Sequence, residues 1–176
     1  ILLGHSMGAG VATLVAASRL LPLTHLLLID AIGPMTQPAK LTATNFATAL
    51  KKRMEVPRPK RVFADAEAAA QTRTQGFGGL SLEASRLLCK RGLMSWEGGY
   101  VWSCDARLRL PTLVYMEEGQ VESLLHNINV PTLLIKALDG IGGKGMLDRR
   151  IGHVRGIKTV DLPGLHHLHM EHPQAV

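Results

Sequence analysis

Five residues near the start of the chain have the spacing of a serine nucleophile motif. Gly4-His5-Ser6-Met7-Gly8 follows the pattern Gly-x-Ser-x-Gly, in which small residues on both sides of the serine let a strand and a helix approach closely. The sharp turn between them raises the serine hydroxyl above the edge of a sheet, and the N-terminus of the next helix favours negative charge there. We therefore expect Ser6 to attack a carbonyl carbon, and the backbone N–H of Met7 to donate to the oxyanion that forms.

The residues on either side of this motif predict the strand and the helix that it needs. Ile1-Leu2-Leu3 indicates the end of a buried strand, and residues 9–21, rich in Ala, Val and Leu, predict a helix that Pro22 ends. The apolar run 25–29 suits a strand buried on both faces, as in a parallel sheet. Strand, helix and strand in about 30 residues form a βαβ unit with a right-handed crossover. This context argues against the alternative, a glycine-rich turn around an inert serine.

A histidine base is expected near the end of the chain. A serine hydroxyl is a weak nucleophile at neutral pH and needs a base that an acid orients. In enzymes built on this turn the chain order is serine, acid, histidine, so the histidine follows the last strand. The loop over 162–173 holds four histidines. His166 comes first after the glycine turn and is the predicted base, with His167 as the alternative.

The same loop offers a possible metal site. His166, His167, His169 and His172 lie in sequence beside Glu171. They do not form the His-Glu-x-x-His pattern of a helical zinc site. A serine nucleophile upstream explains these histidines better than a metal does, so we expect no metal.

Two aspartates compete for the role of the acid. Asp30 directly follows the apolar run 25–29, and Asp139 follows the predicted strand over 130–137 and precedes a flexible, glycine-rich loop over 140–145. Many enzymes with this chain order take the acid from the later strand, and Asp139 lies near that place. Asp30 ends the strand directly after the predicted helix and can also present a carboxylate to the histidine; its alternative role is to cap local backbone N–H groups at the strand end. The residues alone leave both candidates open.

The middle of the chain differs in character from its two ends. Predicted helices there cover 42–54, 65–75 and 81–91, with a basic, proline-containing linker at 56–61 and an irregular or extended stretch over 98–111. The alternation of strand and helix resumes with a helix over 117–128 and strands over 130–137 and 157–162, and a final helix is expected to begin at 171–173. We therefore expect a core made of residues 1–33 and 117–176, interrupted by an insertion of residues 34–116.

Length and composition fit one globular domain with a sizeable core. The chain has 176 residues, of which 46% are hydrophobic. It begins with Ile1 and two further apolar residues, which predicts that upstream residues, including N-terminal strands of the sheet, are missing. No apolar stretch reaches the roughly 18 residues of a membrane span.

The charge distribution and the two cysteines indicate which kinds of binding partner and which cellular compartment to expect. The net charge is +6, and much of it lies in Lys51-Lys52-Arg53 and Arg58 to Arg61. Only 4% of the residues are aromatic and none interleave with these basic clusters, so a solvated helix end and loop explain them better than nucleic-acid binding. Cys89 and Cys104 have no metal or disulfide spacing, and we expect reduced structural thiols in a cytoplasmic protein.

With these residues in place, the chain resembles the α/β-hydrolase superfamily and, within it, the serine hydrolase-like proteins. The superfamily resemblance lies in residues 4–8 and 163–173, and the closer resemblance adds 28–34, 98–108 and 131–135. It implies an α/β-hydrolase fold, a mostly parallel sheet flanked by helices, with a helical cap insertion and no cofactor. It also implies an acid at Asp30, in preference to Asp139. Haloalkane dehalogenases are similar in this segment, but they use an aspartate where this chain has Ser6.

The resemblance further implies that the insertion is a cap or lid over the active site. Trp96, Tyr100 and Trp102 are candidates to line the pocket beside His5, with a role as core aromatics of the cap as the alternative. The expected activity is hydrolysis of an ester or related acyl bond of a small molecule. Two alternatives stay open: carbon–carbon bond hydrolysis on the same triad, and a non-catalytic member that binds a small ligand.

Overall fold

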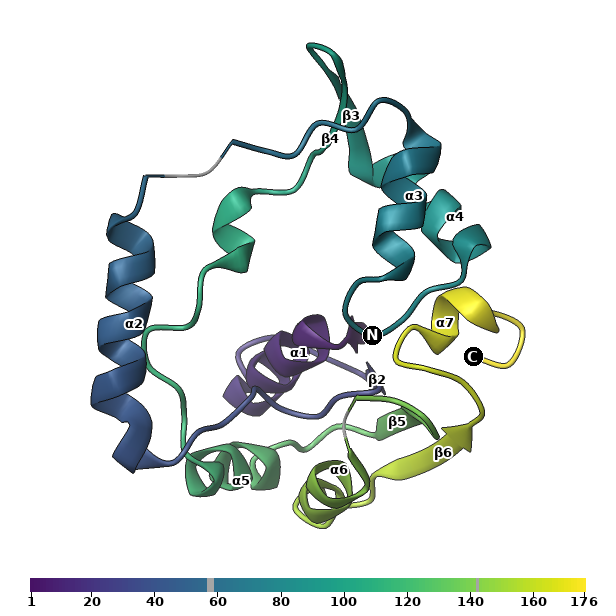
Figure 1. Cartoon of the computed structure of the whole chain (residues 1–176). Coiled ribbons are helices and arrows are strands. Elements are labelled where there is room, and N and C mark those ends of the chain that lie inside the picture. Colours follow the sequence, from purple (N-terminus) through teal and green to yellow (C-terminus); the bar gives the residue numbers. More distant parts are fainter. Residues whose placement is uncertain (57–58, 142) are drawn as a thin grey trace. The chain divides into compact units, whose positions relative to one another are not determined.

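The chain folds into two compact units (Figure 1). The structure, a computed structural model, describes residues 1–56, 59–141 and 143–176. Two residues of the predicted basic linker, Pro57 and Arg58, and one residue of the predicted glycine-rich loop, Gly142, lie outside the described residues. Unit 1 comprises Ile1–Lys40 and Tyr115–Val176, and unit 2 comprises Leu41–Val114.

Unit 1 is built on a parallel sheet. Its strands are β1 (Leu2–His5), β2 (Leu26–Ile29), β5 (Thr132–Ala137) and β6 (Lys158–Leu162). They lie in the order β1-β2-β5-β6, and every neighbouring pair is parallel. His5 is in register with Ile29, which is in register with Ile135, so these strands end at one edge of the sheet. The predicted α/β fold with a parallel sheet is confirmed.

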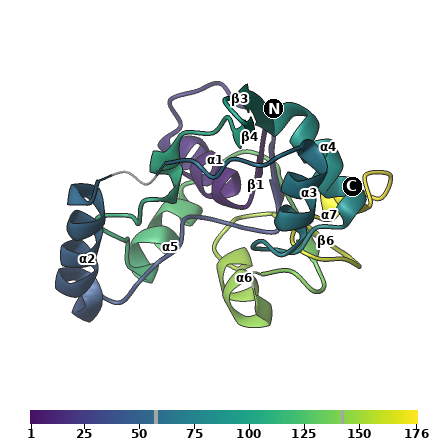
Figure 2. The same cartoon turned by 45° about the horizontal axis from the view of Figure 1, so that its top comes forward.

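The two faces of this sheet bury different apolar clusters. The helices of unit 1 are α1 (Met7–Ser18), α5 (Glu118–His126), α6 (Gly143–Ile151) and α7 (Leu168–Glu171). Leu28 of β2 packs in a cluster with residues of α1, α5 and α6, whereas Ile29 packs with Leu168 of α7. Neighbouring strand residues point to opposite faces, which explains why β2 is apolar throughout. Helices α1 and α5 lie side by side in both views (Figures 1 and 2).

Two helix predictions in unit 1 need correction, and one helix was not predicted. Helix α1 spans Met7–Ser18 rather than 9–21, so it begins directly after the serine turn and ends before Pro22. The final helix predicted from Glu171 is wrong, because α7 ends at Glu171; the residue before Pro173 is disfavoured in a helical conformation. Helix α6 was not predicted, because its sequence begins with glycines and carries few apolar residues.

Unit 2 combines helices with a hairpin. Its described elements are α2 (Thr42–Met54), α3 (Ala66–Thr74), α4 (Leu82–Gly92), β3 (Leu93–Trp96) and β4 (Gly99–Trp102), with a short 3₁₀ turn at Ala106–Arg109. Another 3₁₀ turn, Ala39–Leu41, spans the boundary between the two units in the sequence. The side chains of Asp65 and Ser81 accept hydrogen bonds at the starts of α3 and α4, the usual role of such residues. Strands β3 and β4 are antiparallel. Strand β4 lies in the stretch predicted to be irregular or extended, whereas β3 precedes that stretch and was not predicted.

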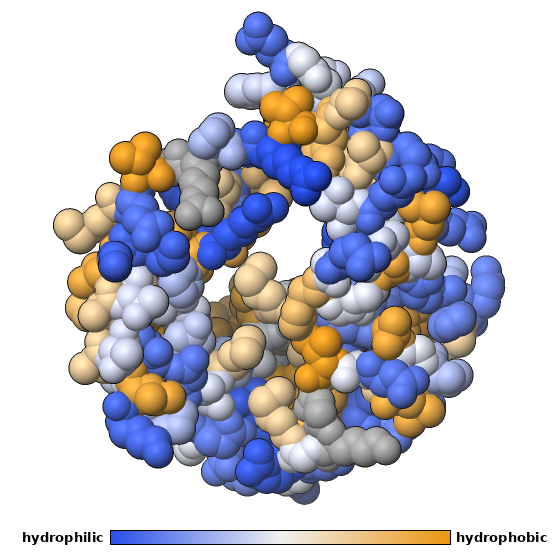
Figure 3. Space-filling model, viewed as in Figure 1, coloured by the Kyte–Doolittle hydropathy of each residue, from blue (hydrophilic) through white to orange (hydrophobic). Residues whose placement is uncertain are grey.

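Unit 2 has its own apolar cluster. Phe63, Ala69, Ala70 and Cys89 are buried together, and Trp102 packs against them. On the face shown in Figure 3, hydrophilic and hydrophobic residues are mixed within each unit. None of the described helices combines the length and the apolarity needed to cross a membrane.

Candidate active site

Ser6 lies on a strained turn between β1 and α1. Its φ of 54° and ψ of −122° are rare for a residue with a side chain. Gly4 is required for steric reasons, because a Cβ at this position would collide with the backbone of Gly8 and Ala9. A Cβ on Gly8 would meet nothing within 4 Å, so the structure shows no steric requirement for the second glycine of the motif.

Asp30 and His166 form a fully buried pair. His166 Nδ1 lies 2.7 Å from Asp30 Oδ2, and their side chains are 1% and 0% exposed. Asp30 Oδ1 accepts a hydrogen bond from the backbone N–H of Ala137 (3.1 Å), and Oδ2 accepts one from Ile141 (3.3 Å). The carboxylate is therefore held by the end of β5 and the loop after it, with one oxygen directed at the histidine ring.

The loop after β5 contributes backbone groups rather than a carboxylate. Asp139 is exposed, and its backbone N–H donates to the Gly164 carbonyl (3.1 Å). A Cβ on Gly140 would collide with the carboxylate of Asp30, so this loop must keep a glycine beside the buried acid. The geometry thus supports Asp30 as the partner of His166 and leaves Asp139 at the surface.

His5 links the serine turn to the histidine loop. Its Nε2 donates a hydrogen bond to the carbonyl oxygen of His166 (2.8 Å). Ser6 Oγ itself makes no hydrogen bond to His166 within the described part of the chain; such bonds often tighten only when substrate binds. Met7 is 69% exposed, and its backbone N–H is one of those that a helix start leaves without an intrahelical partner.

Three histidine rings, those of His5, His167 and His169, lie close together beside the Asp30–His166 pair. The rings of His5 and His169 have centroids 4.2 Å apart, and those of His5 and His167 are 5.1 Å apart. The pKa of His5 is lowered to about 4: burial is the main cause, the bond to the His166 backbone opposes it, and the nearby histidines add a smaller lowering effect. Burial likewise lowers the pKa of His169.

Three of the four histidines that sequence reasoning grouped lie together, and the fourth, His172, is exposed. His166 bonds to Asp30, and its ring also lies 4.6 Å from that of His5 and 5.0 Å from that of His167. The rings of His167 and His169 lie beside that of His5. Sequence reasoning missed that His5 belongs to this group. The sequence did carry a signal for this. His5 lies at the carboxyl end of β1, and the histidine loop is expected at the same edge of the sheet.

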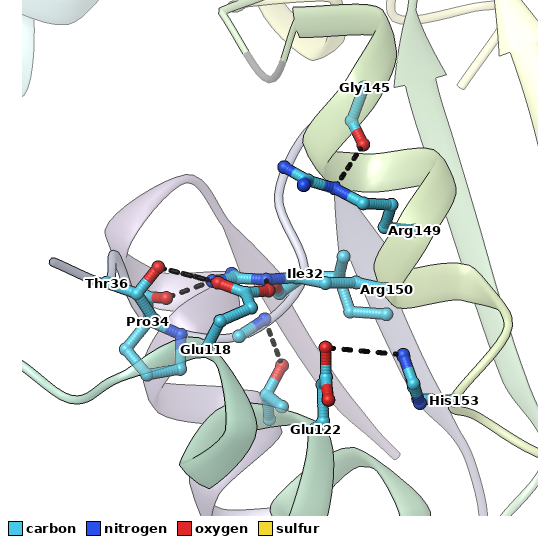
Figure 4. Close-up of polar contacts among 11 residues, drawn as sticks. Ile32, Pro34, Thr36, Glu118, Glu122, Gly145, Arg149, Arg150 and His153 are labelled. Atoms are coloured by element: carbon cyan, nitrogen blue, oxygen red, sulfur yellow. Dashed lines mark hydrogen bonds and ion pairs between the residues drawn. The ribbon is translucent and has the colours of Figure 1, made fainter. Parts of the chain in front are cut away.

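Arg150 holds the segment that follows Asp30 (Figure 4). Its side chain is 1% exposed; Nε and Nη2 donate to the two carboxylate oxygens of Glu118 at 2.6 and 2.8 Å. Its Nη1 donates to the carbonyl oxygens of Ile32 (2.7 Å) and Pro34 (2.9 Å). The hydrogen bonds from Arg150 lower the pKa of Glu118 to about 2. Nothing in the local sequence marked Arg150, because both partners of this ion pair come from distant helices.

The aromatic residues predicted to bind substrate all lie in unit 2. Trp102 packs against the apolar cluster of that unit, whereas Trp96 is 56% exposed and Tyr100 is 38% exposed. The environment of Trp102 therefore agrees with the alternative prediction, in which it is a core aromatic rather than a pocket residue. The role of these residues in substrate binding stays a prediction.

Comparisons with known proteins cover the whole chain. A family model described as the alpha/beta hydrolase family matches residues 1–176. A serine hydrolase-like protein of Dictyostelium discoideum is 27% identical over 188 residues, covering 99% of this chain and 52% of the relative. One of Danio rerio is 25% identical over 187 residues, covering 99% of this chain and 57% of the relative. The chain spans about half the length of the curated relatives it matches.

Solved structures show the same architecture. A hypothetical protein from Pseudomonas aeruginosa PAO1 has a TM-score of 0.88 and 34% identity, over 96% of this chain and 60% of that one. A thioesterase domain from the curacin biosynthetic pathway has a TM-score of 0.80 and 28% identity, over 98% of this chain and 63% of that one.

Proposed function

The chain belongs to the alpha/beta hydrolase family, and on that basis we propose that the protein is a serine hydrolase that cleaves an ester or related acyl bond of a small molecule. The observation that carries this proposal is the buried hydrogen bond between His166 Nδ1 and Asp30 Oδ2, next to a serine on a strained strand-to-helix turn. A histidine oriented in this way by an acid is the base that a serine nucleophile requires.

The proposed mechanism assigns one step to each group. Asp30 holds the His166 ring through Nδ1, which leaves Nε2 to take the hydroxyl proton of Ser6. Ser6 Oγ then attacks the carbonyl carbon, and the Met7 N–H donates to the oxyanion of the tetrahedral intermediate. His166 returns the proton to the leaving alcohol, and water hydrolyses the acyl-enzyme by the same route.

We further propose that unit 2 is the cap of this enzyme. It is inserted in sequence between Asp30 and β5, and it forms a compact unit with its own apolar cluster. Tyr100 and Trp96 offer exposed aromatic surface that suits contact with an apolar acyl or alcohol group. His5 is the proposed substrate-binding residue of unit 1, because it lies beside both Ser6 and His166.

Hydrolysis of p-nitrophenyl esters of increasing acyl length tests the proposed activity in the purified protein. A thioester series belongs in the same assay, since a structural neighbour is a thioesterase domain. We expect a burst of product from acyl-enzyme formation, and a loss of kcat by a factor of about 10⁴ or more in Ser6→Ala.

Ser18→Ala is the matched control, because Ser18 is an exposed serine at the far end of the same helix. It should keep wild-type rates. Hydrolysis that persists in Ser6→Ala, or that is lost equally in Ser18→Ala, would reject the proposal.

A further inference from the structure

His5, His167 and His169 converge from two distant parts of the chain. His5 ends β1, and the other two lie at the start of α7, after the last strand. One ring nitrogen from each residue lies within 4.8 Å of the others. A tetrahedral zinc ion with bonds of 2.0–2.1 Å needs nitrogens about 3.3 Å apart, so small rotations of these side chains would bring all three into bonding distance.

The hydrogen bond of His5 leaves its other nitrogen available for a cation. A carbonyl oxygen only accepts, so the bond to the His166 carbonyl places the ring hydrogen of His5 on Nε2. The lone pair of the neutral ring is then on Nδ1. Metal-bound histidines commonly use their second nitrogen in this way, donating to a backbone carbonyl that fixes the ring orientation.

His169 supplies a second, independent observation. Its Nδ1 is buried and has no hydrogen-bond partner among the described residues. Buried polar atoms in proteins nearly always have a partner, because a missing one costs free energy. A cation bound at this nitrogen would supply that partner.

We propose that His5, His167 and His169 form a binding site for a divalent transition-metal cation such as Zn²⁺. Three imidazoles with no carboxylate favour zinc, copper, nickel or cobalt over calcium or magnesium, which prefer oxygen ligands. His166 is not part of this group of converging nitrogens, and its Nδ1 is bonded to Asp30. The cation would join the serine turn to the histidine loop, and this proposal does not depend on the hydrolase activity.

Calorimetric titration of the purified, metal-free protein with Zn²⁺ tests the site. We expect one ion per chain, and a loss of affinity of about 100-fold or more in both His167→Gln and His169→Gln. His172→Gln is the matched control, since His172 is an exposed histidine of the same loop, and it should bind as the wild type does. Far-UV circular dichroism shows which variants fold. If only one of His167→Gln and His169→Gln folds, its affinity for Zn²⁺ can still be compared with that of His172→Gln.

Binding of Zn²⁺ at another pair of histidines is the main competing explanation. His126 Nε2 and His153 Nδ1 lie 3.4 Å apart, and Glu122 is 3.6 Å from His153. Binding that is lost in the double variant His126→Gln/His153→Gln, but kept in His169→Gln, would overturn the proposal. An absence of Zn²⁺ binding in the wild type, or an equal loss in His172→Gln, would overturn it as well.

Cobalt gives a check that needs no ligand variant. We expect Co²⁺ added to the wild-type protein to show the intense visible absorption of a four- or five-coordinate ion, and Zn²⁺ to abolish it. The pale spectrum of the six-coordinate hydrated ion, unchanged by the protein, would contradict a three-histidine site.

Discussion

At the scale of single residues, the candidate site depends on which carboxylate orients His166. Asp30 is buried and accepts two backbone hydrogen bonds, whereas the side chain of Asp139 is exposed. The neighbouring Gly140 is tightly constrained, because any side chain there would displace the carboxylate of Asp30. The assignment of Asp30 as the proposed acid therefore rests on the backbone groups around its carboxylate as much as on its position in the sequence.

We predict that Asp30→Asn lowers kcat by about 10⁴-fold, because an amide at this position favours the wrong tautomer of His166. Asp139→Asn should change kcat by only a few-fold, since that side chain faces solvent. Steady-state kinetics on the best ester substrate measure both effects. A large loss in Asp139→Asn alone would show that the acid has been assigned incorrectly.

Sequence reasoning could propose Ser6 and His166 as nucleophile and base because both lie in local patterns. Ser6 is in a five-residue motif, and His166 follows a strand and a glycine turn. The choice of acid could not be made locally, since Asp30 and Asp139 both end strands at the same sheet edge. What separates them is burial and contact with backbone more than 100 positions away, which no pattern within one element reports.

At the scale of elements, α5 and α6 hold the segment that leaves β2. Arg150 of α6 bonds to Glu118 of α5 and to two carbonyls of this segment, a few residues after Asp30 (Figure 4). The Arg150 side chain is fully buried, while that of Glu118 is 35% exposed. Loss of the carboxylate therefore leaves a buried cation without its counter-charge.

We predict that Glu118→Gln lowers the free energy of unfolding at pH 7 by about 1–2 kcal/mol, less than a fully buried pair would, because the carboxylate partly faces water. The pKa of Glu118 is depressed to about 2 in the folded state, so its contribution is present above its ordinary pKa and is lost as the pH falls towards 2. The stabilities of wild type and variant should therefore converge in acid.

Urea unfolding across pH 2.5 to 7 measures this convergence. Glu122→Gln is the control, because Glu122 lies on the same helix and is 3.6 Å from His153 rather than near Arg150. A difference between wild type and Glu118→Gln that stays constant with pH would argue against the ion pair as its source.

The sequence predicts most helices and strands as the correct type of element, but it predicts their first and last residues less well. The apolar runs of β2 and β5 predict buried parallel strands because strands covered on both faces cannot alternate. Helix α6 lacked a comparable signal, since few of its residues are apolar, although Leu147 joins the core. The error at α7 arose because Pro173 was taken as part of a helix start, whereas it lies beyond the helix end.

At the scale of the whole molecule, each unit has its own apolar cluster. Two clusters of unit 1 pack on opposite faces of its sheet. The cluster of unit 2 contains Phe63 and Cys89, and Trp102 packs against it. A Cβ on Gly92 would touch the Trp102 ring, which shows how closely the hairpin packs on the end of α4. Damage to one cluster should therefore appear first in its own unit.

We predict that Trp102→Ala destabilises unit 2 by about 3 kcal/mol, the lower part of the range for a core tryptophan. Hydrogen exchange should show reduced protection in α3 and α4, with a smaller change in β2 and β5. Trp96→Ala is the control from the same hairpin, because Trp96 is 56% exposed. Equal effects of the two substitutions would contradict a core role for Trp102.

Labelling with a fluorophosphonate probe tests the serine nucleophile most directly. We predict one covalent adduct per chain, located by peptide mass spectrometry on Ser6, absent in Ser6→Ala and retained in Ser18→Ala. Asp30→Asn should label more slowly, because His166 is then poorly oriented. No labelling of the wild-type protein, or an adduct that persists in Ser6→Ala, would contradict the central claim that Ser6 is the catalytic nucleophile.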